Sequence, residues 1–251
     1  MRGAYDASAW NLTSAREGHV QGSDPQTWPS VTIILLARHG ESDWNAERRW
    51  QGHADRPLTE RGRVQAQALA ERLAEIALDG VYASDLGRAR ATADVVARSQ
   101  GLGVTVLPAL REVDVGSWSG LTRDEARERF PADYRRWLEG GPGWMDGETY
   151  EAMSERVLAA VRRLISTHPD GRLLVVSHGG PIRAVHAHAL GMDVHAYRRL
   201  RPVEPNARLS AVCAENGRLT RLCPAGEIAD VIAEDERVRA QAGAGPPSPA
   251  G

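Results

Sequence analysis

Two uninterrupted apolar runs, VTIILL at residues 31–36 and LLVV at residues 173–176, constrain the fold more than any other feature of the sequence. A strand with one face in water alternates apolar with polar residues, and neither run shows this alternation. Runs of this length and composition are typical of strands buried on both faces. A sheet with helices packed on both of its faces is therefore expected.

The rest of the chain alternates between short strands and longer helical segments. A helix with Thr59 as its N-cap carries apolar residues at helical spacing as far as Ile76, and Asn216-Gly217 marks the turn of a closing hairpin. Strands that alternate with helices form mostly parallel sheets. We therefore predict an α/β fold, a three-layer sandwich with a mostly parallel central sheet flanked by helices. Further strands are predicted at residues 80–84, 104–107, 209–213 and 218–222, and further helices at residues 87–99, 122–139, 150–167 and from the Gly-Gly-Pro at 179–181 to His188.

The two ends of the chain differ from this pattern. Residues 1–30 are polar, mixed in charge and without sustained periodicity, and the chain ends in AGAGPPSPAG. Such segments bury too little apolar surface to fold on their own. We predict a disordered N-terminal extension at residues 1–30, one domain at residues 31–237 and a disordered tail at residues 238–251.

Charge and hydropathy narrow the function classes. The formal net charge of −2 excludes the strongly basic surface of a nucleic-acid-binding or membrane-surface protein. No window approaches the ~20 apolar residues of a membrane span, and residues 1–30 lack the apolar core of a signal peptide. We expect a cytoplasmic protein that binds neither nucleic acid nor membrane, with a homodimer as its commonest assembly.

Chemically active side chains stand directly after the predicted strands. In an open α/β sheet, the ligand crevice lies beyond the carboxyl ends of the strands. These positions hold two arginines, two histidines and a glutamate, which together predict an anion pocket because guanidinium groups match phosphate oxygens. All 31 basic residues of the chain are Arg, which we attribute to a GC-rich coding background, so only position argues for a particular arginine. The residues are Arg38, His39, Arg88, Glu112 and His178, and Gly179 after His178 would let the backbone approach the anion closely.

This pocket has neither a P-loop pattern nor a carboxylate cluster that could hold magnesium, so no metal ion or cofactor is predicted. Neighbouring guanidinium groups favour a neutral imidazole, whose lone pair can attack phosphorus. His39 is therefore the predicted nucleophile, and it would form a phosphohistidine. An alkoxide leaving group needs a proton at pH 7, and Glu112 is the candidate general acid.

Each of these residues also has an ordinary structural alternative. A histidine beside glycine in a loop is more often a surface or hydrogen-bonded residue. Both Arg88 and Arg90 could be solvated helix charges, although the distance from the strand end favours Arg88. Glu112 could pair with Arg111 or with another exposed charge. Five tryptophans could either pack in the core and lid or face the substrate, namely Trp44, Trp50, Trp118, Trp137 and Trp144.

Four blocks, in order, resemble the histidine phosphatase superfamily, the phosphoglycerate-mutase-like clan. They are RHGESDWN at residues 38–45, SDLGRARATA at 84–93, LREVDVGSWSG at 110–120 and VSHGG at 176–180. The resemblance implies a phosphoglycerate-mutase-like fold, His39 as the phosphorylated residue, Glu112 as the acid and His178 as the second pocket histidine. The implied phosphate and substrate ligands are Arg38, Asn45, Gln51, Gly52, Arg88, His178 and Gly179.

The segment QGHADRPLTERG at residues 51–62 resembles the phosphatase branch of this family. The short interval between Glu112 and Gly147 also favours release and hydrolysis, because a mutase carries a longer insertion there. This implies a phosphatase acting on a small phosphorylated metabolite, with selectivity in residues 46–56 and 123–149. A cofactor-dependent phosphoglycerate mutase and a catalytically inactive phosphate-ligand binding module are the alternatives, and a pocket role for Asn206 is left open.

Overall fold

A computed structural model describes residues 31–141 and 143–223, together with residues 228, 230, 232, 233, 236 and 237. The predicted extension at residues 1–30 and the predicted tail at residues 238–251 lie outside the described residues.

One sheet of six strands forms the centre of the described part of the chain, in the order β3-β2-β4-β1-β5-β6. Strands β3, β2, β4 and β1 are parallel to one another, whereas β5 is antiparallel to β1 and β6 is antiparallel to β5. The predicted mostly parallel sheet and closing hairpin are therefore confirmed. The strands are β1 Val31–Arg38, β2 Gly80–Ala83, β3 Val104–Val106, β4 Arg172–Ser177, β5 Leu209–Glu215 and β6 Arg218–Cys223.

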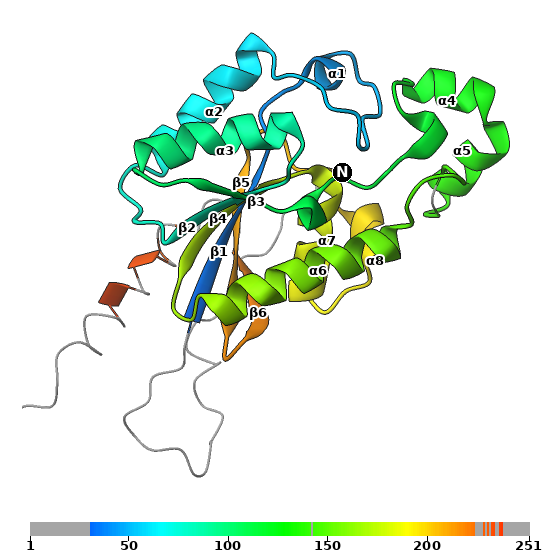
Figure 1. Cartoon of the computed structure of the whole chain (residues 1–251). Helices are drawn as coiled ribbons and strands as arrows, with labels where there is room; N and C mark the ends of the chain where they lie inside the picture. The colour runs from blue at the N-terminus through cyan, green and yellow to red at the C-terminus, as the bar shows by residue number, and fades with distance from the viewer. Residues whose placement is uncertain are drawn as a thin grey trace, which may run out of the picture.

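Helices cover both faces of the sheet, which confirms the three-layer sandwich. In Figure 1, α2 and α3 lie together on one face, and α6, α7 and α8 lie on the other. The helices are α1 Asp43–Ala46, α2 Glu60–Arg72, α3 Gly87–Ser99, α4 Arg123–Arg129, α5 Pro131–Leu138, α6 Tyr150–Thr167, α7 Gly179–Ala189 and α8 Val194–Leu200, with short 3₁₀ turns at Pro108–Leu110 and Gly116–Trp118.

The continuous apolar run of β1 is explained by this double cover. Ile33 and Leu35 join the core between the sheet and helices α2 and α3, whereas Ile34 and Leu36 join the core formed with α6 and α7. All four side chains are at most 1% exposed. Burying each of them contributes about 1.5–3 kcal/mol, so both faces of β1 stabilise its central place in the sheet.

Two helix predictions differ from the structure, and two short helices were not predicted. The segment predicted as one helix over residues 122–139 is two helices, α4 and α5, because Pro131 has no backbone N–H to continue a helix. The helix after Thr59 ends at Arg72 and does not reach Ile76. The short helices α1 and α8 were not predicted, and α8 begins where the Asp193 carboxylate caps the first backbone N–H groups.

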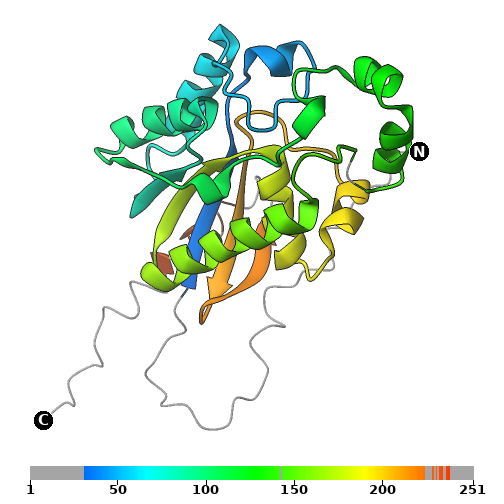
Figure 2. The same cartoon turned by 45° about the vertical axis from the view of Figure 1, so that its right-hand side comes forward.

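Helices α4 and α5 project away from the sheet beyond the ends of its strands, as Figure 1 and the turned view in Figure 2 both show. Aromatic side chains join this arm to the body. Trp137 of α5 lies edge-on to Trp50, with 5.3 Å between ring centroids, and Trp118 and Trp144 are at most 2% exposed. The packing interpretation of these tryptophans is therefore confirmed for Trp118 and Trp144.

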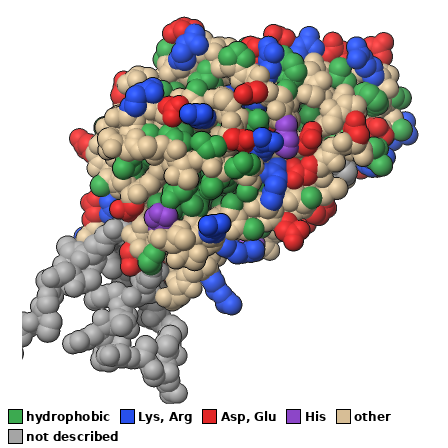
Figure 3. Space-filling view, in the orientation of Figure 1, with side chains coloured by type: hydrophobic (Ala, Val, Ile, Leu, Met, Phe, Trp, Pro, Cys, Tyr) green, Lys and Arg blue, Asp and Glu red, His purple; other side chains and the backbone are tan. Residues whose placement is uncertain are grey.

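Acidic and basic side chains are interspersed over the face drawn in Figure 3, in keeping with the small net charge of the chain. Among the described helices, none is both long enough and apolar enough to cross a membrane.

Candidate active site

The first and last sequence blocks meet because β1 and β4 are neighbours in the sheet. The His39 backbone N–H donates to the Ser177 carbonyl over 3.0 Å, which sets the two strand ends level. The rings of His39 and His178 then lie 5.0 Å apart between centroids, tilted by 59°. Two histidines 139 positions apart in the sequence therefore share one pocket.

His39 is held in the tautomer that an attacking imidazole needs. Its Nδ1 lies 2.7 Å from the Gly40 carbonyl oxygen, which can only accept, so Nδ1 carries the proton and Nε2 keeps its lone pair. The side chain is 2% exposed. Burial, followed by the charges of Arg38 and Arg88, lowers the pKa of His39 well below its ordinary range. The ring is therefore neutral at neutral pH.

The loop that contains Gln51 and Gly52 holds the Arg88 guanidinium through two backbone carbonyls. Its Nη1 donates to the Ala54 carbonyl over 2.7 Å and its Nη2 to the Gly52 carbonyl over 2.9 Å. Burial lowers the pKa of Arg88 to about 10, which leaves it charged at neutral pH. Arg88 is 1% exposed whereas Arg90 is exposed, so the structure places Arg88 and not Arg90 at the pocket.

Four buried side-chain nitrogens beside His39 have no hydrogen-bond partner among the described residues. They are Nε of Arg38, Nε of Arg88 and both ring nitrogens of His178. Arg38 is anchored by its Nη1, which donates to the Glu204 carbonyl over 2.8 Å. Burial, then the charges of Arg88, His39 and Arg38, lowers the pKa of His178. Buried polar groups are normally satisfied, so this set is arranged for a ligand rich in acceptors.

Glu112 reaches the same pocket from the loop after β3. Its Oε1 accepts the backbone N–H groups of Val113 over 2.9 Å and of Gly180 over 3.0 Å. A Cβ atom on Gly180 would collide with this oxygen, so glycine is required for the approach. Arg111 pairs with Asp85 through a forked contact, so the alternative in which Glu112 pairs with Arg111 is wrong.

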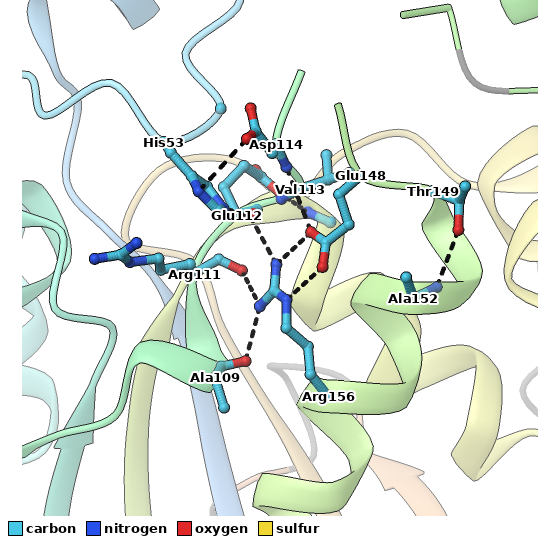
Figure 4. Close-up of polar contacts among 12 residues, drawn as sticks. His53, Ala109, Arg111, Glu112, Val113, Asp114, Glu148, Thr149, Ala152 and Arg156 are labelled. Atoms are coloured by element: carbon cyan, nitrogen blue, oxygen red, sulfur yellow. Dashed lines mark hydrogen bonds and ion pairs between the residues drawn. The ribbon is translucent and has the colours of Figure 1, made fainter. Parts of the chain in front are cut away.

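Arg156 of α6 holds the backbone of the Glu112 loop, as Figure 4 shows. It donates to the carbonyl oxygens of Ala109, Arg111 and Glu112, each over 2.8 Å. Its Nε and Nη2 also donate to the two carboxylate oxygens of Glu148, each over 2.6 Å. All five N–H groups of the guanidinium are thus used, three on the backbone of the Glu112 loop and two on Glu148.

Asn45 and Asn206 support the other side of the pocket. The Asn45 side-chain oxygen accepts from the Ser42 backbone N–H over 3.2 Å and from the Asn206 amide over 3.1 Å. The Asn206 amide also donates to the His39 carbonyl over 3.0 Å. Because its oxygen is engaged, Asn45 has its amide N–H groups left for a ligand. Gln51 is arranged in the same way, with its oxygen 2.8 Å from the Ser42 hydroxyl.

The structure thus brings together the predicted site residues. Gly52 and Gly179 contribute through their backbone. The Gly52 carbonyl accepts a hydrogen bond from Arg88. Gly179 is the first residue of α7, and a Cβ atom added to it would lie only 2.6 Å from Cγ1 of Val203. Sequence reasoning missed Arg156 and Glu148. Among the described residues, no group of three or more His, Cys, Asp or Glu side chains is placed to hold a metal ion.

Comparison with known proteins identifies the family. Residues 34–223 match the family model described as histidine phosphatase superfamily (branch 1). The chain belongs to this superfamily. It is 38% identical over 170 residues to "Probable phosphoglycerate mutase GpmB" of Cronobacter sakazakii, with 67% of this chain and 79% of that protein covered. It is 36% identical over 166 residues to "Phosphoserine phosphatase 1" of Hydrogenobacter thermophilus, with 65% of this chain and 79% of that protein covered.

Solved structures of other proteins share the fold. YhfR of Bacillus stearothermophilus superposes with a TM-score of 0.70 at 31% identity, covering 75% of this chain and 94% of that chain. A mycobacterial glucosyl-3-phosphoglycerate phosphatase in complex with VO3 has a TM-score of 0.68 at 30% identity, covering 77% and 97%. This protein is accordingly an enzyme of the histidine phosphatase superfamily, with relatives that are phosphatases of small metabolites or are named mutases.

Proposed function

We propose that this histidine phosphatase hydrolyses a small phosphomonoester through a phosphohistidine at His39, without a metal ion. The observation that carries the proposal is the set of four unpartnered nitrogens, on Arg38, Arg88 and His178, around a neutral imidazole with a free Nε2. A phosphoryl group presents several acceptor oxygens and spreads negative charge in its transition state. The Nε–H groups of Arg38 and Arg88 and the one N–H of the His178 ring complement that charge.

In the first half of the reaction, Nε2 of His39 attacks phosphorus as the bond from phosphorus to the leaving oxygen breaks. Glu112 gives its proton to that oxygen, so the alcohol leaves neutral. In the second half, Glu112 takes a proton from water as the water oxygen attacks the phosphohistidine. Inorganic phosphate leaves, His39 regains its lone pair and Glu112 regains its proton.

The substrate proposal is a small phosphorylated metabolite. Two relatives carry names that specify phosphoserine and glucosyl-3-phosphoglycerate as substrates. We assign selectivity to residues 46–56 and 123–149, because Trp137 of the second segment packs on Trp50 of the first.

Mutase chemistry is the second candidate, since a relative at 38% identity bears a mutase name. The short connection from Glu112 to Gly147 favours hydrolysis, because a mutase must retain its phosphorylated intermediate for a second transfer. The protein is to be primed with 2,3-bisphosphoglycerate and supplied with 3-phosphoglycerate. We expect phosphate release to exceed formation of 2-phosphoglycerate, and the reverse order would support the mutase.

The test of hydrolysis itself uses p-nitrophenyl phosphate with a chelator present. We expect phosphate release that the chelator leaves unchanged and that His39→Ala abolishes. Full activity in His39→Ala, or activity that depends on added metal, would overturn the proposal. A protein without any hydrolysis would instead support a binding module.

A further inference from the structure

Two half-buried arginines, Arg183 of α7 and Arg198 of α8, stand together next to the pocket without a carboxylate partner. We call them the Arg183–Arg198 pair. Within the described residues neither forms an ion pair, and each has a buried Nε with no hydrogen-bond partner. Two neighbouring guanidinium groups that form no ion pair repel one another, and their partial burial increases the cost.

Backbone and aromatic contacts hold this pair in place. Arg183 donates from Nη2 to the Arg201 carbonyl over 2.8 Å. The Arg198 guanidinium lies 4.3 Å from the centre of the Tyr150 ring, and its Nη1 is 3.4 Å from the Tyr150 hydroxyl. Arg198 also donates to the Gly141 carbonyl over 3.2 Å, at the end of the arm. The pair therefore presents oriented donors that protein carbonyls use only in part.

Glu112 links the Arg183–Arg198 pair to the phosphate site. Its Oε1 accepts the backbone N–H of Gly180 over 3.0 Å in the first turn of α7, and Arg183 follows three residues later on the same helix. Burial lowers the pKa of Arg183, and the charge of Glu112 opposes this shift. Glu112 is thus a common neighbour of the phosphate site and of Arg183. In the proposed reaction the leaving oxygen receives its proton from Glu112, so the alcohol part of the substrate begins at this carboxyl. Arg183 neighbours Glu112 but is not one of the phosphate arginines, so it is placed to contact the alcohol part of the substrate.

We propose that the Arg183–Arg198 pair, with the Tyr150 hydroxyl, binds a second anionic group on the alcohol part of the substrate. This inference rests on the proposed phosphatase function. Carboxylates and phosphates both match guanidinium donors, so the shared chemistry is a phosphomonoester that carries a further carboxylate or phosphate.

The test compares kcat/KM within matched pairs of substrates. O-phosphoserine and O-phosphoethanolamine differ by one carboxylate, and fructose 1,6-bisphosphate and fructose 6-phosphate differ by one phosphate. We expect the wild-type enzyme to prefer the member with the second anion in at least one pair, by about 10- to 100-fold, which is the usual range for charged hydrogen bonds. No preference in either pair overturns the inference.

Variants then assign any preference to the pair. In Arg183→Gln, kcat/KM for the preferred substrate should fall about 10- to 100-fold while its matched partner changes less than about threefold. Arg183→Lys should keep part of the preference, and Arg163→Gln, at an exposed position of α6, should keep all of it. Equal losses on both substrates would mean a structural role and would overturn the inference. Hydrolysis of p-nitrophenyl phosphate by the wild-type enzyme separates this outcome from failure of the phosphatase proposal.

Discussion

Arg156 holds the backbone of the Glu112 loop, and Arg156→Gln should therefore slow the reaction by an amount that the lost contacts predict. The variant loses most of the donors to the carbonyls of Ala109, Arg111 and Glu112 and leaves the Glu148 carboxylate without its forked partner. Each charged hydrogen bond is worth about 1.5–3 kcal/mol, so the loop should relax away from its position. A displacement of about 1 Å at a reacting group costs on the order of 100-fold in rate.

The effect should depend on the leaving group. An alkyl phosphate needs a proton from Glu112, whereas p-nitrophenolate leaves readily without one. By rapid-quench measurement of a single turnover, we expect enzyme phosphorylation by an alkyl phosphate to slow about 100-fold in Arg156→Gln, and by p-nitrophenyl phosphate less than about threefold. Arg163→Gln, on the exposed face of the same helix, is the control. Equal slowing with both substrates would refute a role for Arg156 in positioning the acid.

Three further predictions concern single residues. Burial lowers the pKa of His186 from 6.5 to about 4, so as the pH falls below 6.5 the unfolded chain is protonated before the folded protein and the free energy of unfolding decreases. Urea unfolding at pH 8 and pH 5 should show that His186 accounts for about 2 kcal/mol of this decrease, which His186→Gln should lack. An equal decrease in the wild type and the variant would contradict this. Arg88→Lys keeps a charge but loses the guanidinium that two carbonyls hold and whose Nε has no protein partner, so kcat/KM for p-nitrophenyl phosphate should fall about 10- to 100-fold. Wild-type kinetics would speak against a phosphate contact that needs the guanidinium geometry. Gly180→Ala pushes a methyl group into Glu112 and should lower alkyl phosphate hydrolysis by at least about tenfold, whereas Gly103→Ala, where an added Cβ meets nothing within 4 Å, should not; similar activity in the two variants would dismiss the close approach.

The central sheet could be predicted because its signal is local. Ile33 to Leu36 are all buried, and a short apolar run rich in β-branched residues is typical of a strand covered on both faces. Helix α1 could not be found in this way, since four residues show no periodicity and its Ser42 capping box became apparent only in the structure. The break between α4 and α5 had a visible signal in Pro131, which the prediction of one helix over residues 122–139 did not use.

The pocket residues could be predicted because they follow strand ends, where the parallel sheet gathers them. Arg156 could not, because its partners Ala109 to Glu112 lie 44 to 47 positions away in the sequence. On its own helix, Arg156 has the pattern of a solvated charge. The side chain of Asn206 likewise reaches His39 over 167 positions, so only tertiary structure identifies its contact.

The central claim is that Nε2 of His39 receives the phosphoryl group, and trapping the intermediate tests it most directly. The enzyme is to be quenched in alkali within the first turnover on a phosphomonoester, and the phosphopeptides mapped by mass spectrometry. We expect phosphate on His39 that is stable in alkali, labile in acid and absent from His39→Ala. Phosphate on another residue, or turnover without a phosphorylated enzyme at any time point, would contradict the account.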